Sequence, residues 1–208
     1  MNVTLLTKQE HFADMEYFTA LAALTCHDNT DKDFVPAEVL KRRIKENHGS
    51  VLEHINLTYS IKGISRALLQ ELSRHRHISL SVESTRFTLR KKLEDGIEHY
   101  PVHAIMVQVP GIDTKFNLFD ELFSVLGNIA AKNPDFSNDE LKYYIPEFWP
   151  TNLILTSNVR ELRHILNLRT APQALKEFRD LAHQLFNVVP EQFKYLLQDC
   201  VHEEVNNA

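Results

Sequence analysis

Cysteine is scarce in this sequence, and long apolar runs are absent. Cys26 and Cys200 are its two cysteines. They stand far apart, which excludes a disulfide framework and the close spacing of a metal cluster. We therefore expect reduced thiols and a cytoplasmic protein. Because no apolar stretch is as long as a bilayer span and the N-terminus lacks a basic-then-apolar layout, neither a membrane helix nor a secretion signal is predicted.

A linker rich in glycine, serine or proline is also missing. The length of 208 residues is typical of one domain, so residues 1–208 are predicted to form a single domain. Apolar residues make up 43% of the chain, which is enough for a core. The net charge of −5 argues against the basic field that nucleic-acid-binding domains use.

One segment departs from this acidic balance. Residues 74–92 carry six lysine or arginine residues and a single glutamate. A short basic segment in an acidic protein favours a site for an anionic ligand over a nucleic-acid surface. An RNA-binding surface built on Arg74–Lys92 stays an alternative, although Phe87 is the one aromatic residue there for base stacking.

Hydrophobic periodicity predicts a mixed fold, α/β or α+β, with strands separated by helices. Strict alternation from Ile55 to Ile61 marks the clearest strand, which Gly63 is expected to end. Shorter strands are expected at residues 3–6 and 153–156. Helices are expected at residues 12–23, 36–45, 64–75, 116–132, 137–144, 159–169, 172–188 and 190–201.

Two details of these helices can be tested. In the first helix, Phe12, Met15, Phe18 and Ala22 stand at the spacing of an apolar stripe, with Thr19 as its polar member. Ser65 is a candidate cap for the helix that begins near residue 64.

The segment from residue 73 to 87 carries the chemistry best suited to an anion. If the helix runs to His75, that histidine lies on its apolar stripe, and Arg74 and Arg76 point about 100° to either side. Such arginines suit different ligands, or the sites of different subunits. A polar loop with hydroxyl groups and Arg86 follows, which is what a phosphate monoester needs.

Less specific interpretations stay open for these residues. A histidine on an apolar stripe is often a hydrogen-bonded core residue, and arginines at a helix end often complement the helix dipole. No metal site is predicted, because His75 and His77 would face apart on a helix. Ser84 has no evident base partner that would make it a nucleophile, so we interpret it as a phosphate ligand.

The pattern Arg74-His75-Arg76, then seven residues, then Ser84 resembles the signature of the flavin-dependent thymidylate synthases, the ThyX family. Residues 48–54 resemble the family's histidine, hydroxyl and Glu-His element. Residues 158–162 resemble its Asn-Ala-Arg-Ser-Leu element, and residues 167–169 its Asn-Leu-Arg element. The resemblance implies a central, mostly antiparallel sheet flanked by helices, in a homotetramer whose subunits share active sites.

The same resemblance implies an activity and its ligands. The expected reaction is reductive methylation of dUMP to dTMP, with FAD as cofactor and NADPH and 5,10-methylenetetrahydrofolate as co-substrates, and without nucleic acid or membrane partners. The positions implied to contact FAD are Ser50, Glu53, Arg74, His75, Arg76, Val82, Asn158, Val159, Arg160 and His164. Those implied to contact dUMP are Glu71, Leu72, Ser73, Arg74, Val82, Glu83, Ser84, Thr85, Arg86, Lys142 and Arg169.

Arg169 is the predicted catalytic residue. It continues the apolar stripe of Val159, Leu162, Ile165 and Leu166 at the end of its helix. An arginine there needs a buried anion or a helix-end carbonyl as partner, and the resemblance selects the anion, a uracil edge that loses its N3 proton. Because arginine stays protonated, its role would be electrostatic.

Two departures from the family pattern motivate another alternative. Val82 stands where many members carry glutamate, and Phe87 replaces the usual tyrosine. A flavin- or nucleotide-binding module without catalytic activity therefore stays open. Neither Cys26 nor Cys200 has the flanking pattern of the cysteine nucleophile used by the other class of thymidylate synthase.

Overall fold

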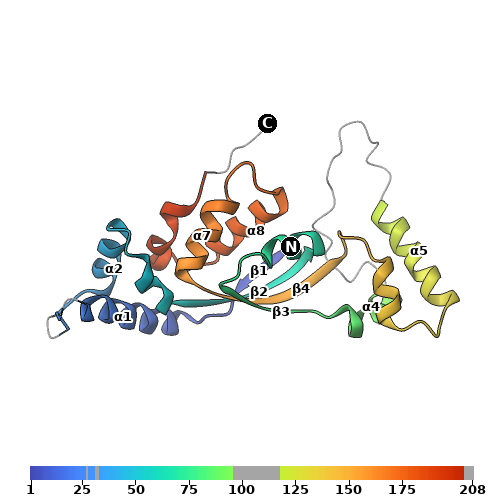
Figure 1. The fold of residues 1–208 in the computed structure, drawn as a ribbon, viewed down its shortest axis with the longest axis horizontal. Helices are drawn as coiled ribbons and strands as arrows, with labels where there is room; N and C mark the ends of the chain where they lie inside the picture. The colour runs from blue at the N-terminus through green and yellow to red at the C-terminus, as the bar shows by residue number, and fades with distance from the viewer. Residues whose placement is uncertain (27, 31–32, 96–117, 204–208) are drawn as a thin grey trace. The chain divides into compact units, whose positions relative to one another are not determined.

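The computed structural model describes residues 1–26, 28–30, 33–95 and 118–203. It contains two compact units (Figure 1). Unit 1 comprises Met1–Asn2, Ile61–Leu72 and Ser81–Leu153, and unit 2 comprises Val3–Ser60, Ser73–Leu80 and Ile154–Ala208. The prediction of a single domain stays a prediction.

The strands form one four-stranded sheet. They are β1 (Asn2–Leu5), β2 (Asn56–Ser65), β3 (Ile78–Val82) and β4 (Pro150–Asn158), in the order β1-β2-β4-β3. On β2 and β4 the hydroxyls of Thr58 and Thr156 meet at 3.0 Å, while the N–H of Val159 donates to the carbonyl of Ile55. Rising numbers on one strand thus meet falling numbers on the other, so this pair is antiparallel. The predicted mixed fold is confirmed.

Unit 2 is largely helical. Its elements are α1 (Gln9–Thr25), α2 (Pro36–Lys45), the 3₁₀ turn η1 (Gly49–His54), α7 (Val159–Arg169), α8 (Lys176–Asn187) and the 3₁₀ turns η4 (Glu191–Leu196) and η5 (Gln198–Cys200). The predicted bounds of α2 and α7 are confirmed, whereas residues 190–201 form 3₁₀ turns and not the expected α-helix. At Phe12 the ring stacks on Phe193 with centroids 4.1 Å apart.

The predicted apolar stripe of α1 was partly wrong. Phe12 is buried, but Phe18 is 61% exposed, and the buried side of α1 contains Thr19, Ala20 and Ala23. Phe12, Thr19 and Ala23 are spaced by seven and four residues, which defines one helix face. The small side chains on this face allow the close packing of α1 against α2.

Unit 1 has a core of its own. Its helices are α3 (Arg66–Leu72), α4 (Thr85–Asp95), α5 (Leu118–Lys132) and α6 (Asn138–Leu141), and α6 continues into the 3₁₀ turn η3 (Lys142–Tyr144). Trp149 is buried among Leu89, Leu126 and Leu141. A capping box between Ser137 and Glu140 starts α6.

The segment around the signature motif differs from the prediction. Gly63 does not end β2, because its positive φ of 72° is accessible to glycine and the side chain of Asn152 accepts its N–H. The cap at Ser65 is confirmed, since its hydroxyl accepts the N–H of Leu68 at 3.0 Å. Helix α3 ends at Leu72, so residues 74–76 lie in a turn and the expected helical geometry of the three residues was wrong.

The expected polar loop after this turn is replaced by a strand and a helix. β3 covers residues 78–82, and α4 begins at Thr85. Just after β3, the N–H of Glu83 donates to the carbonyl of Asn152 in β4 at 2.9 Å. Pairing with β4 therefore sets this conformation, which local sequence preference does not reveal. In the described residues, no helix combines the length and apolar character of a membrane span.

Candidate active site

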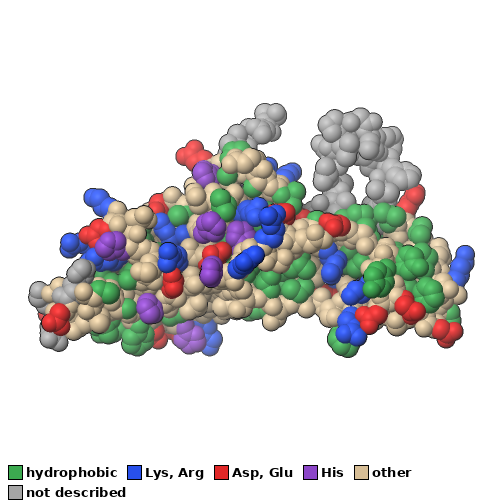
Figure 2. Space-filling model, in the orientation of Figure 1, with side chains coloured by type: hydrophobic (Ala, Val, Ile, Leu, Met, Phe, Trp, Pro, Cys, Tyr) green, Lys and Arg blue, Asp and Glu red, His purple; other side chains and the backbone are tan. Residues whose placement is uncertain are grey.

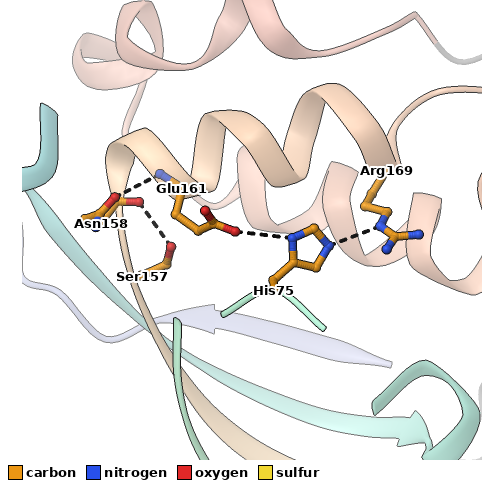
Figure 3. A network of polar contacts seen from close by, with 5 residues as sticks. All are labelled: His75, Ser157, Asn158, Glu161 and Arg169. Atoms are coloured by element: carbon orange, nitrogen blue, oxygen red, sulfur yellow. Dashed lines mark hydrogen bonds and ion pairs between the residues drawn. The ribbon is translucent and has the colours of Figure 1, made fainter. Parts of the chain in front are cut away.

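Three side chains of unit 2 form a continuous polar chain around His75 (Figure 3). Glu161 near the start of α7 and Arg169 at its end both point toward the imidazole. The Glu161 carboxylate lies 3.2 Å from Nδ1 of His75, and Nε of Arg169 lies 3.2 Å from Nε2. His75 and Glu161 are buried, with 7% and 8% of their surfaces exposed. His75 is thus a hydrogen-bonded buried residue, although the turn and not a helix places it there.

Arg169 occupies the position that the stripe on α7 predicts. Val159, Leu162, Ile165 and Leu166 are fully buried, and Arg169 extends this face at the helix end. Its guanidinium carbon lies 4.5 Å from the centroid of the buried Phe178 ring on α8. An imidazole nitrogen and an aromatic face therefore orient this cation.

The electrostatics keep His75 neutral. Burial lowers the pKa of His75 below its ordinary value, and the nearby charge of Arg169 lowers it further, while the hydrogen bond to Glu161 acts in the opposite direction. A neutral imidazole agrees with the geometry, because Nε of arginine is always a donor and needs a lone pair on Nε2.

A metal could in principle be drawn to the same place. His75, Glu161 and His164 present ligand atoms within 4.8 Å of one another. However, both ring nitrogens of His75 already have partners, and the permanent cation Arg169 contacts one of them. A metal ion would have to displace this cation, so the arrangement does not favour a metal site.

A second group of the predicted residues lies around η1. Ser50 and Arg160 line a cavity of about 420 Å³, together with Arg43, Asn47, His48, Ala23, Cys26, Gly49 and Val51. Arg160 also donates to Glu53 at 2.6 Å. The cavity walls thus carry two guanidinium groups, an imidazole and neutral hydrogen-bonding groups, which suit a phosphate- or hydroxyl-bearing ligand. In the space-filling view, Lys, Arg and His side chains gather over the α7 region (Figure 2).

The remaining predicted residues of unit 2 differ in their exposure. Arg74, Arg76 and Ser73 are exposed in the turn before β3, and His164 is exposed on α7. Asn158 caps α7 by accepting the N–H of Glu161 at 2.8 Å.

The predicted nucleotide loop lies in unit 1. Ser84 precedes α4 and Thr85 begins it, while Arg86 is exposed and forms an ion pair of 2.9 Å with Asp139. Lys142 stands in η3, which contacts α4. Val82 is exposed at the end of β3, and Glu71 is half-buried on α3.

Several charged residues of the basic segment are used inside unit 1. Glu83 pairs with Lys92 at 2.6 Å and accepts a hydrogen bond from Asn152 at 2.7 Å. Arg90 donates to the carbonyls of residues 130, 133 and 136. These contacts give Glu83 an internal role and take two cations away from any RNA-binding surface.

Two other predicted contact residues have packing roles. The side chains of Leu72 and Val159 are fully buried, and the N–H of Val159 is bonded to Ile55. Neither side chain is available to a ligand in this conformation.

Comparison with known proteins decides the family. The family model described as "Thymidylate synthase complementing protein" matches residues 7–193. The chain belongs to the flavin-dependent thymidylate synthase family. It is 37% identical to a flavin-dependent thymidylate synthase of Campylobacter jejuni over 192 residues, covering 88% of this chain and 92% of the relative. It is 39% identical to a flavin-dependent thymidylate synthase of Helicobacter pylori over 163 residues, or 74% and 76% of the two chains.

A solved structure of this family agrees with the fold. The crystal structure of ThyX from Helicobacter pylori with FAD and dUMP superposes with a TM-score of 0.78 and 29% identity, over 98% of this chain and 100% of that one. The predicted family and enzyme class are thereby confirmed. Three residues near the predicted site, Glu161, Phe178 and Asp139, were not predicted from the sequence. Glu161 had one usable signal, since it stands four residues before the buried Ile165 and so lies near the inner face of α7.

Proposed function

We propose that the chain forms dTMP from dUMP by reductive methylation, with FAD as cofactor and with NADPH and 5,10-methylenetetrahydrofolate as co-substrates. The observation that carries this proposal is the fixed cation at the end of α7, where His75 and the Phe178 ring orient Arg169. The crystal structure of the Helicobacter relative holds FAD and dUMP, and its name supports the same ligands here.

The residues of unit 2 fit a flavin dinucleotide by their chemistry. Ser50 and Arg160 at the cavity, with Arg74 and Arg76 in the exposed turn, offer hydroxyl and guanidinium donors to phosphate and ribityl oxygens. We assign the cofactor contacts to these residues and to Asn158 and His164. When bound, FAD supplies the reducing equivalents of the methylation.

The protein's own contribution is positioning and charge. Arg169 places a permanent positive charge where negative charge on the uracil edge needs stabilisation after loss of the N3 proton. Arg86 and the hydroxyls of Ser84 and Thr85 are assigned to the phosphate of dUMP. Without the nucleotide, Arg86 forms its ion pair with Asp139.

We also propose a homotetramer with shared sites, which the family resemblance implies. Most of the predicted nucleotide contacts lie in unit 1, whereas Ser73, Arg74 and Arg169 lie in unit 2 with most of the predicted cofactor contacts. A cytoplasmic location stays a prediction, based on its two free cysteines, Cys26 and Cys200.

The test of the function is a complete assay. Purified protein should be yellow and should form dTMP from dUMP when methylenetetrahydrofolate and NADPH are both present. Removal of the flavin should abolish the product, and adding FAD back should restore it. Binding of FAD and dUMP without product at any pH would instead identify a module that lacks catalytic activity.

The catalytic assignment has a sharper test. Arg169→Ala should abolish turnover while the protein keeps its flavin absorbance. Arg169→Lys keeps the charge but loses the planar donor fork, so it should recover little activity. Arg42→Ala serves as a matched control, because Arg42 is an exposed arginine that pairs with Glu46 on α2. Full activity in Arg169→Ala would remove Arg169 from this role.

A further inference from the structure

Glu161 is a buried carboxylate that the family resemblance does not explain. The corresponding position in the Asn-Ala-Arg-Ser-Leu element carries serine, whereas this chain has glutamate. Its side chain points toward His75 (Figure 3), and Glu161 is buried. A buried carboxylate is unfavourable unless it is paired. Here its observed partner is the imidazole of His75, at 3.2 Å.

The geometry determines which nitrogen of His75 carries the proton. Nε of Arg169 is a donor and has no lone pair. Its contact of 3.2 Å with Nε2 therefore requires that Nε2 accept. In a neutral imidazole the proton then lies on Nδ1, which donates it to Glu161. Carboxylate, imidazole and guanidinium form a directed chain in which Nε–H of Arg169 donates to Nε2 of His75 and Nδ1–H of His75 donates to Glu161.

This chain bridges two distant points of one helix. Glu161 and Arg169 are eight residues apart on α7, roughly 12 Å along the axis of an α-helix. His75 comes from a different segment and fills the space between them (Figure 3). The imidazole also lies near the rings of His164, at 5.9 Å between centroids, and Phe178, at 5.8 Å. Among the residues that the structure describes, the groups whose charges or hydrogen bonds act on the pKa of His75 are Glu161, Arg169 and His164.

We propose that Glu161 is a positioning residue of the active site. Its carboxylate holds His75 in the tautomer protonated at Nδ1, so that Nε2 stays available to receive Nε–H of Arg169 and orients the guanidinium plane. This inference rests on the proposed catalytic role of Arg169. A glutamine at residue 161 has a similar shape, but it can present its NH₂ group to Nδ1. The proton would then move to Nε2, which would face the Nε–H donor of Arg169.

The experiment combines kinetics with a direct measurement of the tautomer. Glu161→Gln should lower kcat for dTMP formation by roughly ten- to a hundredfold, the usual loss when a group that orients a site residue is removed. Flavin content and KM for dUMP should stay within about twofold of the wild type, because Glu161 is not assigned a contact with either. In nitrogen-edited NMR spectra, His75 should be protonated at Nδ1 in the wild type and should change tautomer in Glu161→Gln.

Two further variants separate positioning from general structural damage. Glu161→Asp keeps the charge with a shorter reach and should be more active than Glu161→Gln. This variant also keeps the test usable if Glu161→Gln folds poorly. Asp199→Asn removes a carboxylate that pairs with Arg163, which lies on α7 as Glu161 does. This variant should leave kcat unchanged.

The pH dependence of kcat is a further measurement, and a glutamate with only a structural role would not change it. Protonation of Nε2 removes the acceptor for Arg169, so kcat should fall at low pH. In Glu161→Gln the neutral imidazole already carries its proton on Nε2, so kcat should be low throughout and should lose this dependence on pH.

The outcomes distinguish this proposal from the proposed function. A changed tautomer with wild-type kcat in Glu161→Gln would overturn the positioning role and leave the function intact. A wild-type His75 found protonated at Nε2 would overturn the proposal without any activity measurement. Turnover in Arg169→Ala would instead refute the catalytic assignment of Arg169.

Discussion

The ion pair between Glu83 and Lys92 gives the most quantitative prediction. Their charged atoms are 2.6 Å apart, and the side chains are 18% and 6% exposed. Lys92 also donates to the carbonyl of Pro150 at 3.4 Å, and Asn152 donates to the second Glu83 oxygen at 2.7 Å. Lys92→Met removes the cation and leaves the Glu83 carboxylate inside unit 1 with the hydrogen bond from Asn152 but without its ion-pair partner. Since Glu83 precedes α4 and Lys92 lies in its last turn, this change loosens the attachment of α4.

Removing one member of a buried ion pair costs about 3–5 kcal/mol. The remaining bond from Asn152 and the partial exposure of Glu83 place the expected loss near the lower end, about 3 kcal/mol. For a chain of this length, that loss corresponds to a decrease of roughly 6–12 °C in the melting temperature. The double variant Glu83→Gln with Lys92→Met buries no charge, so it should return to within about 1 kcal/mol of the wild type.

Urea unfolding at fixed protein concentration, without ligands, measures all four members of this double-mutant cycle. The two single variants should each be destabilised, and the coupling energy should be clearly favourable. If Lys92→Met lost less than about 1 kcal/mol, the pair would behave like an exposed one. Burial would then not strengthen this ion pair, contrary to our prediction.

Three other predictions concern single side chains. The pKa of His75 is lowered from 6.5 in the folded state. The contribution of neutral His75 to the free energy of unfolding should therefore be fully present above pH 6.5 and should decline as the pH falls below that value. Urea midpoints should decline less over this pH range in His75→Gln. Ser65→Ala removes the cap of α3 and should cost about 0.5–2 kcal/mol in urea unfolding, with a smaller loss in Ser65→Asn. Asp139→Asn breaks an exposed pair and should change stability by less than about 1 kcal/mol. The same change should lower KM for dUMP by freeing Arg86, and an increase in KM would contradict the assignment.

The sequence predicted α7 well and α3 poorly, for identifiable reasons. In α7, Asn158 is a strong cap and the apolar residues repeat at helical spacing, so both ends were marked. After Leu72 no glycine or proline signals a stop, and the helix ends because the following turn places His75 beside α7. Similarly, the serines of β3 have little strand preference, and pairing with β4 decides their conformation.

The candidate site was predicted in part. The stripe on α7 indicated where Arg169 would lie, but its contact with His75 joins residues 94 positions apart. Such contacts depend on how the chain brings distant strands and helices together, and hydrophobic periodicity carries no information about this arrangement. Glu161 was missed because a glutamate in the first turn of a helix ordinarily complements the dipole and faces water.

Asn152 has a consequence for the chemistry that the fold tolerates. Its carbonyl oxygen receives the N–H of Gly63, and its amide nitrogen donates to Glu83. The neutral side chain of Asn152 thus accepts a hydrogen bond at its oxygen and donates one at its nitrogen. Hydrolysis of this amide to a carboxylate would keep the shape but set two negative charges against each other. An Asn152→Asp change would therefore destabilise unit 1 although it alters no apolar side chain.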